Sequence, residues 1–294
     1  MATARNGDVE IFYETFGDSS HAALLLANGL GSQCINYRAE WCQQFAAEGF
    51  FVIRFDNRDV GLSTKFSHVR PDVMSVAAAM AAGEDPKAPY LLSDMAADAV
   101  AVLDDLGIER AHVLGLSMGG MIVQTMAIEH PERLLSMTSL MSTTGDRDVG
   151  QPAPDSQALL FSPPPKDRAG YIERQLASIR TWGSPACYDE ERIAAHAGEA
   201  FDRCFDPAGQ ARQLMAITAS GTRTESLRHV RVPTLVLHGD ADRLVDPSGG
   251  QRTAEAVPGA RFVMIEGMGH DYPPAYWGRL VELVTDHARS SVAS

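Results

Sequence analysis

The sequence lacks any apolar run close to the roughly 18 residues that a membrane-spanning helix needs. The longest runs include residues 22–27 and 76–82, which have the length of a buried strand or a short helix. The first nine residues contain no hydrophobic stretch of the kind that secretory signals carry. From these absences we expect a protein that neither spans a membrane nor enters the secretory route, and hence a cytoplasmic location.

Cysteine is scarce, and its few positions form no recognisable site. Four cysteines stand apart, at positions 34, 42, 187 and 204, without a C-x-x-C pair. Free thiols are the favoured interpretation, with disulfides or a metal site as the alternative. The chain also has no H-E-x-x-H motif, and residues 28–31 lack the G-x-G-x-x-G spacing of a dinucleotide-binding turn. We therefore expect no metal and no cofactor.

Positive charge is in short supply. Lysine and arginine number 25 against 38 aspartate and glutamate residues, a formal net charge of −13, and no five consecutive like charges occur. Such a surface repels the phosphates of nucleic acids and of anionic lipids. The expected partner is thus a small molecule, with neither nucleic acid nor membrane, and the pattern specifies no oligomeric state.

The sequence does have strand and helix patterns that alternate along the chain. Its 294 residues, 45% of them hydrophobic, are enough to bury a large core. Alternation of this kind is typical of an α/β fold with a mostly parallel central sheet flanked by helices. Several β-rich runs are apolar throughout, as expected when helices cover both faces of the sheet. Strands are expected at residues 9–15, 23–26, 50–55, 110–114, 135–141, 234–238 and 261–265.

One long stretch interrupts this alternation. Residues 142–229 show no convincing strand, and three helices are expected there after a proline-rich linker. We interpret this stretch as a helical cap inserted before the penultimate strand, with residues 1–141 and 230–294 forming the core. A smaller segment, residues 65–89, carries methionines and alanines and is a second candidate to cover a site.

Ser117 is the candidate nucleophile. It lies in Gly115-Leu116-Ser117-Met118-Gly119, between an expected strand and an expected helix at residues 121–130. In the G-x-S-x-G pattern the serine occupies a strained turn, and the residues two before and two after it approach so closely that only glycine fits. The following helix adds the positive end of its dipole beneath a developing anion. The alternative is a chance match in a glycine-rich loop, which the flanking strand and helix disfavour.

His270 is the candidate base. A serine hydroxyl needs an adjacent base to attack at neutral pH, and after a G-x-S-x-G turn the acid and then the histidine follow along the chain. Among nine histidines, His270 ends the flexible turn Gly267-Met268-Gly269 after the last expected strand. His238 ends a strand in a position suited to a structural hydrogen bond. His287 lies in the last helix and is expected at the surface.

The acid should follow the strand at residues 234–238. The next loop offers three carboxylates, Asp240, Asp242 and Asp246. Asp242 is favoured because it lies in the middle of the loop, whereas Asp246 precedes a proline and is expected to cap the next helix. Its task would be to hold His270 in the right tautomer and to stabilise the imidazolium. The order Ser117, Asp242, His270 is the one that the motif requires.

Acyl transfer also needs two N–H donors aimed at the oxyanion. One is expected at the backbone of Met118, directly after the nucleophile. The second should come from the loop after an earlier strand. That loop is Asn28-Gly29-Leu30-Gly31, and the backbone N–H of Leu30 is favoured, with an ordinary glycine turn as the alternative. The side chains of Leu30 and Met118 are expected to narrow the acyl pocket.

Together with Asp56-Asn57-Arg58-Asp59-Val60-Gly61-Leu62-Ser63, these motifs resemble the α/β-hydrolase superfamily over residues 7–288. Within it the chain is similar to bacterial carboxylesterases of the aclacinomycin-type anthracycline methylesterase branch, through D-x-R-D-x-G-x-S-T at residues 56–64. The resemblance implies the α/β-hydrolase fold and suggests a polyketide ester as substrate. Asn28 departs from the histidine of many members, and Asp59 from their glycine. Asp56 and Arg58 are expected to tie the loop beside the site.

The favoured function is hydrolysis of a small or medium carboxylic ester through an acyl-enzyme, carried by Ser117, Asp242 and His270. The same triad also supports carbon–carbon bond hydrolysis of a diketone, or perhydrolysis, because a fold does not fix a function. Haloalkane dehalogenases and epoxide hydrolases attack with an aspartate and are disfavoured by the serine. A ligand-binding protein that reuses the fold is disfavoured because all three triad positions are filled.

Overall fold

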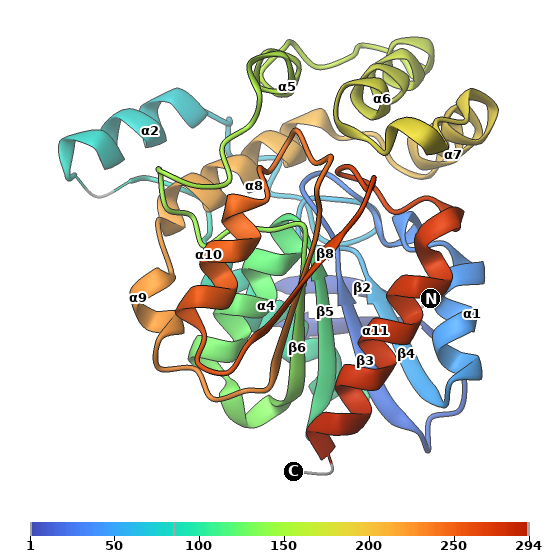
Figure 1. Cartoon of the computed structure of the whole chain (residues 1–294). Helices are drawn as coiled ribbons and strands as arrows, with labels where there is room; N and C mark the ends of the chain where they lie inside the picture. Colours follow the sequence, from blue (N-terminus) through green and yellow to red (C-terminus); the bar gives the residue numbers. More distant parts are fainter. Residues whose placement is uncertain (1, 85, 293–294) are drawn as a thin grey trace.

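The computed structural model describes residues 2–84 and 86–292 and is built around one eight-stranded sheet (Figure 1). The strands run in the order β1-β2-β4-β3-β5-β6-β7-β8. Pairing is parallel from β4 through β3 to β8 and antiparallel for β1 with β2 and β2 with β4. The mostly parallel α/β sheet that the sequence predicts is therefore confirmed. The strand bounds are β1 (Ala2–Asn6), β2 (Val9–Phe16), β3 (Ala22–Ala27), β4 (Phe50–Phe55), β5 (Ala111–Leu116), β6 (Leu134–Leu140), β7 (Thr234–Gly239) and β8 (Arg261–Ile265).

Seven of these strands match the predicted runs to within two residues at each end, and β1 was not predicted. β1 has the sequence ATARN, in which only Ala4 is buried, and it pairs with β2 at the edge of the sheet. An edge strand with one small buried side chain has no hydrophobic alternation to detect. Its existence depends on the hydrogen-bonding edge that β2 offers, which the sequence of β1 itself does not encode.

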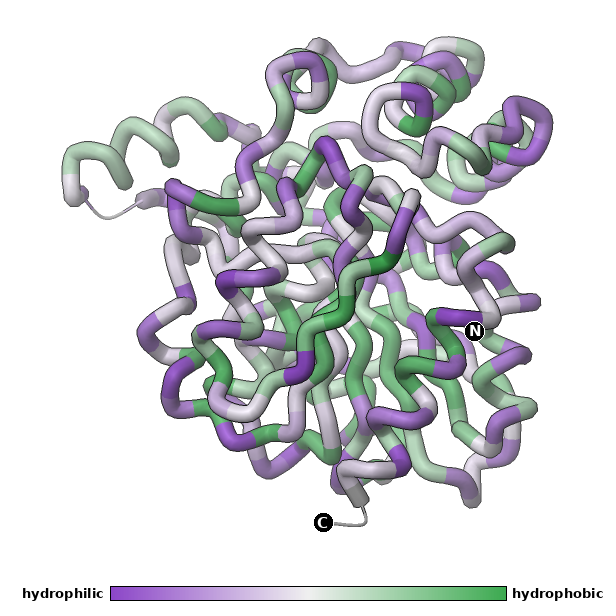
Figure 2. Tube along the Cα trace, in the orientation of Figure 1, coloured by the Kyte–Doolittle hydropathy of each residue, from purple (hydrophilic) through white to green (hydrophobic). Residues whose placement is uncertain are grey.

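Helices cover both faces of the sheet. One core cluster packs strands against α3 (Leu92–Asp105), α4 (Met118–Glu129) and the end of α10 (Ser248–Ala256). The other packs them against α1 (Ala39–Ala47) and α11 (Pro274–Val292). Leu25 of β3 belongs to the first cluster, while Leu24 and Leu26 belong to the second, because successive side chains of a strand point to opposite faces. Figure 2 shows the hydrophobic residues concentrated along the central strands.

The stretch between β6 and β7 is helical, as predicted, but among the described residues it holds five α-helices and one short 3-10 helix (Pro185–Cys187) where three helices were expected. Figure 1 shows α5, α6 and α7 above the sheet, and α8 beneath them. α9 packs on α4 and α10 instead, so the end of the stretch lies beside the core. The division into a core and a cap of residues 142–229 stays a prediction. The helices are α5 (Pro154–Leu160), α6 (Arg168–Trp182), α7 (Glu190–Arg203), α8 (Pro207–Ser220) and α9 (Thr224–Leu227).

The described part of the second predicted covering segment, residues 65–84 and 86–89, contains one helix, α2 (Val73–Ala82), which packs against α8. Asp72 begins α2 by accepting a hydrogen bond from the backbone of Ser75, and Gly83 ends it with φ +72°. Among the described residues, no helix combines the length and the apolar character needed to cross a bilayer.

Candidate active site

Ser117 lies in a sharp turn between β5 and α4. Its φ of +56° is rare for a residue with a side chain, and Ser117 is one of three non-glycine residues with a positive φ among those described. Its N–H donates to the carbonyl of Leu140 in β6, and its carbonyl accepts from the hydroxyl of Ser142. These bonds hold the turn in place while the Oγ projects beyond the carboxyl end of the sheet.

The glycines around Ser117 are required by close backbone approaches. A Cβ built on Gly115 would lie 2.0 Å from the carbonyl oxygen of Gly119, and a Cβ on Gly119 would lie 1.9 Å from that of Ala27. Side-chain carbons do not approach backbone oxygens so closely, so neither position accepts any other residue without displacing the backbone. The sequence-based expectation for both glycines is confirmed.

The structure brings the three predicted side chains together in one hydrogen-bonded chain. The Oγ of Ser117 lies 3.0 Å from Nε2 of His270, and Nδ1 of His270 lies 2.7 Å from Oδ2 of Asp242. A carboxylate only accepts hydrogen bonds, so Nδ1 carries the proton and Nε2 is free to accept from the serine hydroxyl. This is the arrangement in which an imidazole acts as a general base toward a serine.

Asp242 is held ionised and fixed in orientation. Its other oxygen, Oδ1, accepts hydrogen bonds of 2.9 Å from the backbone N–H groups of Leu244 and Val245. Burial by itself would raise the pKa of Asp242, but the charge and hydrogen bonds of His270 and His238 outweigh it and lower the pKa to about 2. The side chain is 0% exposed, so these partners act without competition from water.

The two alternative acids have other partners. Asp240 accepts a 2.7 Å hydrogen bond from the N–H of Gly267, and Asp246 accepts one of 3.0 Å from Ser248 at the start of α10. Asp246 therefore bonds to the first N–H of α10, but the N-cap position itself is occupied by Pro247, one residue later than predicted. Among the described residues, no three His, Cys, Asp or Glu side chains gather where they could hold a metal ion.

Of the two alternative histidines, His238 behaves as expected and His287 does not. His238 makes the predicted structural hydrogen bond, from Nε2 to the carbonyl of Val245 at 2.8 Å, and also lies 3.2 Å from Oδ2 of Asp242. His287 is buried rather than at the surface, and burial lowers its pKa. Its Nε2 lies 3.2 Å from the carbonyl of Pro233, because α11 presses its inner face against the sheet.

The loop that carries His270 is also held by residues at the end of α6 and directly after it, which the sequence did not indicate. The N–H of His270 donates to the carbonyl of Trp182 at 2.6 Å, and the N–H of Gly269 donates to the hydroxyl of Ser184 at 2.9 Å. Asp271 in turn accepts from both the N–H and the hydroxyl of Ser184. The end of α6 therefore fixes the histidine loop from above.

The predicted oxyanion loop lies beside the nucleophile. A Cβ built on Gly29 would lie 3.4 Å from the Cβ of Ser117 and 3.9 Å from its Oγ. Within residues 2–84 and 86–292, neither the N–H of Leu30 nor that of Met118 has a hydrogen-bond acceptor. Met118 is the first residue of α4, where a backbone N–H has no partner inside the helix. Its side chain packs in the core, whereas that of Leu30 is half-buried against it.

Asn28, which departs from the family pattern, braces this loop through three amide contacts. Its Nδ2 donates to the carbonyl of Gln33, and its Oδ1 accepts from Nδ2 of Asn36, both at 3.1 Å. Its carbonyl accepts from Nδ2 of Asn57 at 3.0 Å. A neutral amide side chain both donates and accepts, so Asn28 serves both neighbours at once while fully buried.

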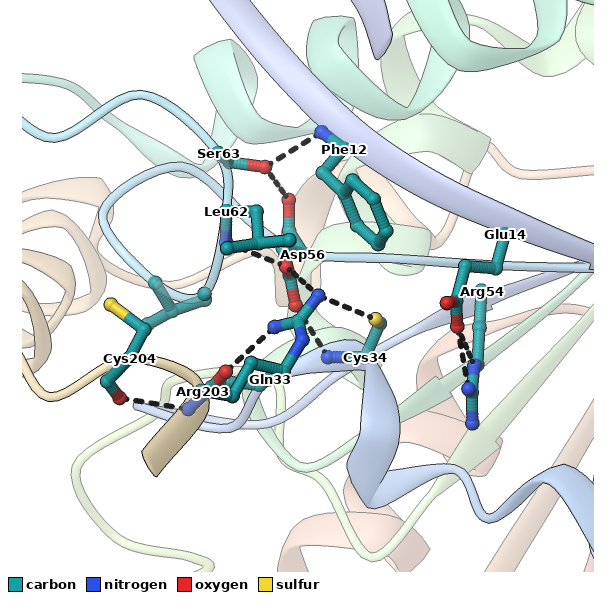
Figure 3. A network of polar contacts seen from close by, with 12 residues as sticks. Phe12, Glu14, Gln33, Cys34, Arg54, Asp56, Leu62, Ser63, Arg203 and Cys204 are labelled. Atoms are coloured by element: carbon teal, nitrogen blue, oxygen red, sulfur yellow. Dashed lines mark hydrogen bonds and ion pairs between the residues drawn. The ribbon is translucent and has the colours of Figure 1, made fainter. Parts of the chain in front are cut away.

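Asp56 joins the loop of residues 56–63 to α7 (Figure 3). Its carboxylate accepts from the N–H groups of Cys34 and Leu62 and pairs with Arg203 of α7 at 2.7 Å. Arg203 also donates to Oε1 of Gln33 at 2.6 Å. Arg58 pairs with Asp98 of α3 through two hydrogen bonds of 2.6 and 2.7 Å. Both residues thus have the structural part that the sequence predicts for them.

Asp59 stands where many relatives carry glycine, and the structure shows why both fit. Its φ is +71°, a conformation that favours glycine. Its two carboxylate oxygens accept from Arg212 of α8 at 2.8 and 2.9 Å, and the hydroxyl of Tyr90 donates to one of them at 2.6 Å. The backbone strain is therefore offset by a buried ion pair to α8.

Replacing Arg212 by methionine is expected to lower the free energy of unfolding by about 3–5 kcal/mol, because it leaves the buried Asp59 carboxylate without its cation. The two side chains are 2% and 0% exposed. Arg168 in α6 is a matched control, since its pair with Asp202 is 52% and 58% exposed, and Arg168→Met should change stability by about 1 kcal/mol or less. Chemical denaturation measures both values. Equal losses for the two variants would contradict the assignment of Arg212 as a buried anchor.

Comparisons with known proteins agree with this geometry. A family profile described as the alpha/beta hydrolase fold matches residues 22–272. Rhodomycin D methylesterase DnrP of Streptomyces peucetius is 30% identical, over 97% of each chain, and DauP of Streptomyces sp. strain C5 is 29% identical over 97% and 96%. The solved enol-lactonase of Burkholderia xenovorans LB400 superposes with a TM-score of 0.74 at 23% identity, over 97% of this chain and 99% of that one.

These matches confirm the resemblance to anthracycline methylesterases and support the expectation of a carboxylic ester hydrolase acting on a small molecule. The profile begins at β3, before the oxyanion loop, and ends just after His270. It therefore spans the serine turn, the acid loop and the histidine loop in one match. Since that match covers most of the chain and the fold agrees with it, the chain belongs to the α/β-hydrolase fold family.

Proposed function

We propose that this protein is a serine hydrolase that cleaves a carboxylic ester through an acyl-enzyme, with Ser117 as nucleophile, His270 as base and Asp242 as acid. The observation that carries the proposal is the continuous chain from the Ser117 Oγ through His270 to Asp242, with contacts of 3.0 and 2.7 Å. Both contacts lie within hydrogen-bonding reach, as nucleophile–base and base–acid pairs require.

In the first half-reaction Nε2 of His270 takes the proton of Ser117 as the Oγ attacks the ester carbonyl. The backbone N–H groups of Leu30 and Met118 hold the resulting oxyanion, and the amino end of α4 adds its positive dipole. The tetrahedral intermediate collapses when His270 gives its proton to the leaving alcohol. Water then attacks the acyl-enzyme by the same steps, releasing the acid and restoring Ser117.

The substrate class we propose is the methyl ester of an aromatic polyketide, which would give a free carboxylic acid and methanol. Support comes from two relatives named rhodomycin D methylesterases, each aligned over nearly its whole length. The helices α5 to α8 lie above the sheet, beyond the carboxyl end of β5 that Ser117 follows. Residues 142–229 would therefore act as the cap that shapes the pocket. The four cysteines are free thiols, which fits the reducing cytoplasm as the place of action.

Carbon–carbon bond hydrolysis is the second candidate, because a meta-cleavage product hydrolase of Pseudomonas fluorescens IP01 shares the fold, with a TM-score of 0.72. At 19% identity that likeness concerns the fold alone. A 2-hydroxy-6-oxo-dienoate separates the two chemistries. The ester proposal expects methanol release from a polyketide methyl ester and no cleavage of the dienoate. The reverse result would favour the carbon–carbon hydrolase.

A fluorophosphonate probe tests the proposed nucleophile directly. The probe phosphonylates a serine whose hydroxyl is activated by a neighbouring base. We expect the label on Ser117, located by peptide mass spectrometry, and loss of ester hydrolysis in step with labelling. Labelling of Ser142 or another serine, or full activity in a fully labelled protein, would remove Ser117 from the mechanism.

A further inference from the structure

Gln213, on the cap helix α8, reaches into the core and contacts the oxyanion loop. Its Oε1 accepts a 2.8 Å hydrogen bond from the N–H of Gly31, and its Nε2 donates a 2.8 Å hydrogen bond to the carbonyl of Arg58. The side chain is 0% exposed. The oxygen and the nitrogen of one buried amide therefore join two core loops. The proposed reaction steps give this residue no part.

The helix that carries Gln213 has little freedom to move. The neighbouring Arg212 is bound to both carboxylate oxygens of Asp59. One turn earlier, Gly209 packs so closely that a Cβ built on it would lie 2.0 Å from the carbonyl oxygen of Asp59. A backbone contact at Gly209 and an ion pair at Arg212 thus fix the turn of α8 that leads to Gln213 against the core. The position of its amide is set by the cap.

The contact at Gly31 falls on the turn that orients Leu30. The N–H of Ser32 donates to the carbonyl of Gly29 at 3.2 Å, which closes a turn with Leu30 and Gly31 at its centre, and Gly31 has φ +68°. In a planar trans peptide, the N–H of Leu30 points opposite to the carbonyl of Gly29. The N–H of Gly31 belongs to the central peptide, the one whose rotation interconverts turn types. Its bond to Gln213 opposes that rotation.

We infer that Gln213 is a positioning residue for the oxyanion hole: from α8 it holds the central peptide of the Gly29–Ser32 turn. The turn so held keeps the carbonyl of Gly29 on the N–H of Ser32, and the N–H of Leu30, which points the opposite way, aimed at the oxyanion. This inference rests on the proposed function, in which Leu30 supplies one of the two donors. It makes α8 part of the catalytic geometry as well as part of the cover. The rest of the loop is braced from the core by Asn28.

The test replaces Gln213 by methionine, which has a similar length and makes neither hydrogen bond. Complete loss of one oxyanion donor lowers kcat by roughly 10²–10³-fold, so loss of its brace should lower kcat by about tenfold, with KM changed by less than about threefold. Rates are expressed per active site, from titration with the fluorophosphonate. A trifluoromethyl ketone forms a hemiketal with Ser117 and carries its negative charge on the oxyanion. Its affinity should fall by the same factor as kcat/KM, while that of the carboxylate product stays unchanged.

Two further variants complete the experiment. Gln213→Asn keeps a neutral amide in this buried position but is one methylene shorter, so it too should lose the bond to Gly31 and lower kcat and the ketone affinity severalfold; it provides the test if the methionine variant does not fold. Gln43→Met, at an exposed position of α1 outside the cap, is the control and should match the wild type. Wild-type kcat and ketone affinity in whichever of the two Gln213 variants folds would overturn the inference. A wild-type protein without esterase activity would instead overturn the proposed function.

Discussion

Replacing Ser117 by alanine is expected to lower kcat for a p-nitrophenyl ester by about 10⁶-fold, to a rate set by the oxyanion hole and binding alone. The Oγ is the atom that forms the acyl-enzyme, and His270 at 3.0 Å is its partner in the structure. Alanine removes that atom and leaves the backbone contacts of the turn to Leu140 and Ser142 in place. The loss should therefore appear in catalysis and leave the fold intact.

Steady-state kinetics and thermal unfolding measure the two sides of this prediction. The melting temperature of Ser117→Ala should stay within about 3 °C of the wild type, because no buried packing is removed. Ser20→Ala, a change at an exposed serine near the start of β3, is the matched control and should keep full activity. Retention of more than about one per cent of kcat would be incompatible with Ser117 as the nucleophile.

Replacing Asp242 by asparagine is expected to lower kcat by roughly 10⁴-fold, the loss that the corresponding change causes in serine proteases. The environment of Asp242 dictates how the asparagine must sit. Oδ1 accepts from the N–H groups of Leu244 and Val245, so the asparagine oxygen has to occupy that place. Its NH₂ group then faces Nδ1 of His270. The imidazole is forced into the tautomer with a proton on Nε2, which cannot accept the proton of Ser117.

The neighbouring Asp240→Asn is a matched control, because an asparagine oxygen still accepts from the N–H of Gly267. Its kcat should stay within about twofold of the wild type. The pH–rate profiles of the two variants and the wild type complete the measurement. If Asp242→Asn keeps a kcat within tenfold of the wild type, a different carboxylate must hold the histidine.

The low pKa of Asp242 also predicts how stability depends on pH. The pKa of Asp242 is about 2 in the folded protein, against 3.8 for an aspartate outside the fold, so folding favours the ionised form. The resulting stabilisation is fully present above the unfolded pKa and is lost as the pH falls from about 4 to about 2; it amounts to about 2 kcal/mol. Asp242→Asn lacks this titration. The stability difference between the two proteins should therefore shrink over that pH range in urea denaturation.

The candidate site was predictable to the extent that it depends on local geometry and chain order. Ser117 could be found because its turn needs glycine at two fixed positions, which leaves a readable pentapeptide. Asp242 and His270 could be found because parallel strands deliver their following loops to one edge of the sheet, in a known order. The seven predicted strands were readable for a related reason, since fully buried strands must be apolar on both faces.

Other features were out of reach because they depend on partners far away in the chain. In the sequence, Gln213 is one polar residue among others in a helix. Its role becomes visible only in its hydrogen bond to Gly31, 182 positions away. His287 was wrongly expected at the surface, because one histidine in a helix does not show which face is buried. The hold of Trp182 on the His270 loop is a backbone contact and carries no side-chain signal at all.

The sequence by itself determined the chemistry of this protein: a strained serine turn, an acid and a histidine in the right order, and a sheet able to carry them. Each of these depends on short-range steric demands or on strand periodicity, which are written into neighbouring residues. Only the tertiary structure showed that α8 contacts the loops beside the candidate site, through the pairs of Asp59 with Arg212 and of Gly31 with Gln213. Those contacts join segments that are distant in sequence, and the close packing of α8 against the core is what brings them within hydrogen-bonding distance.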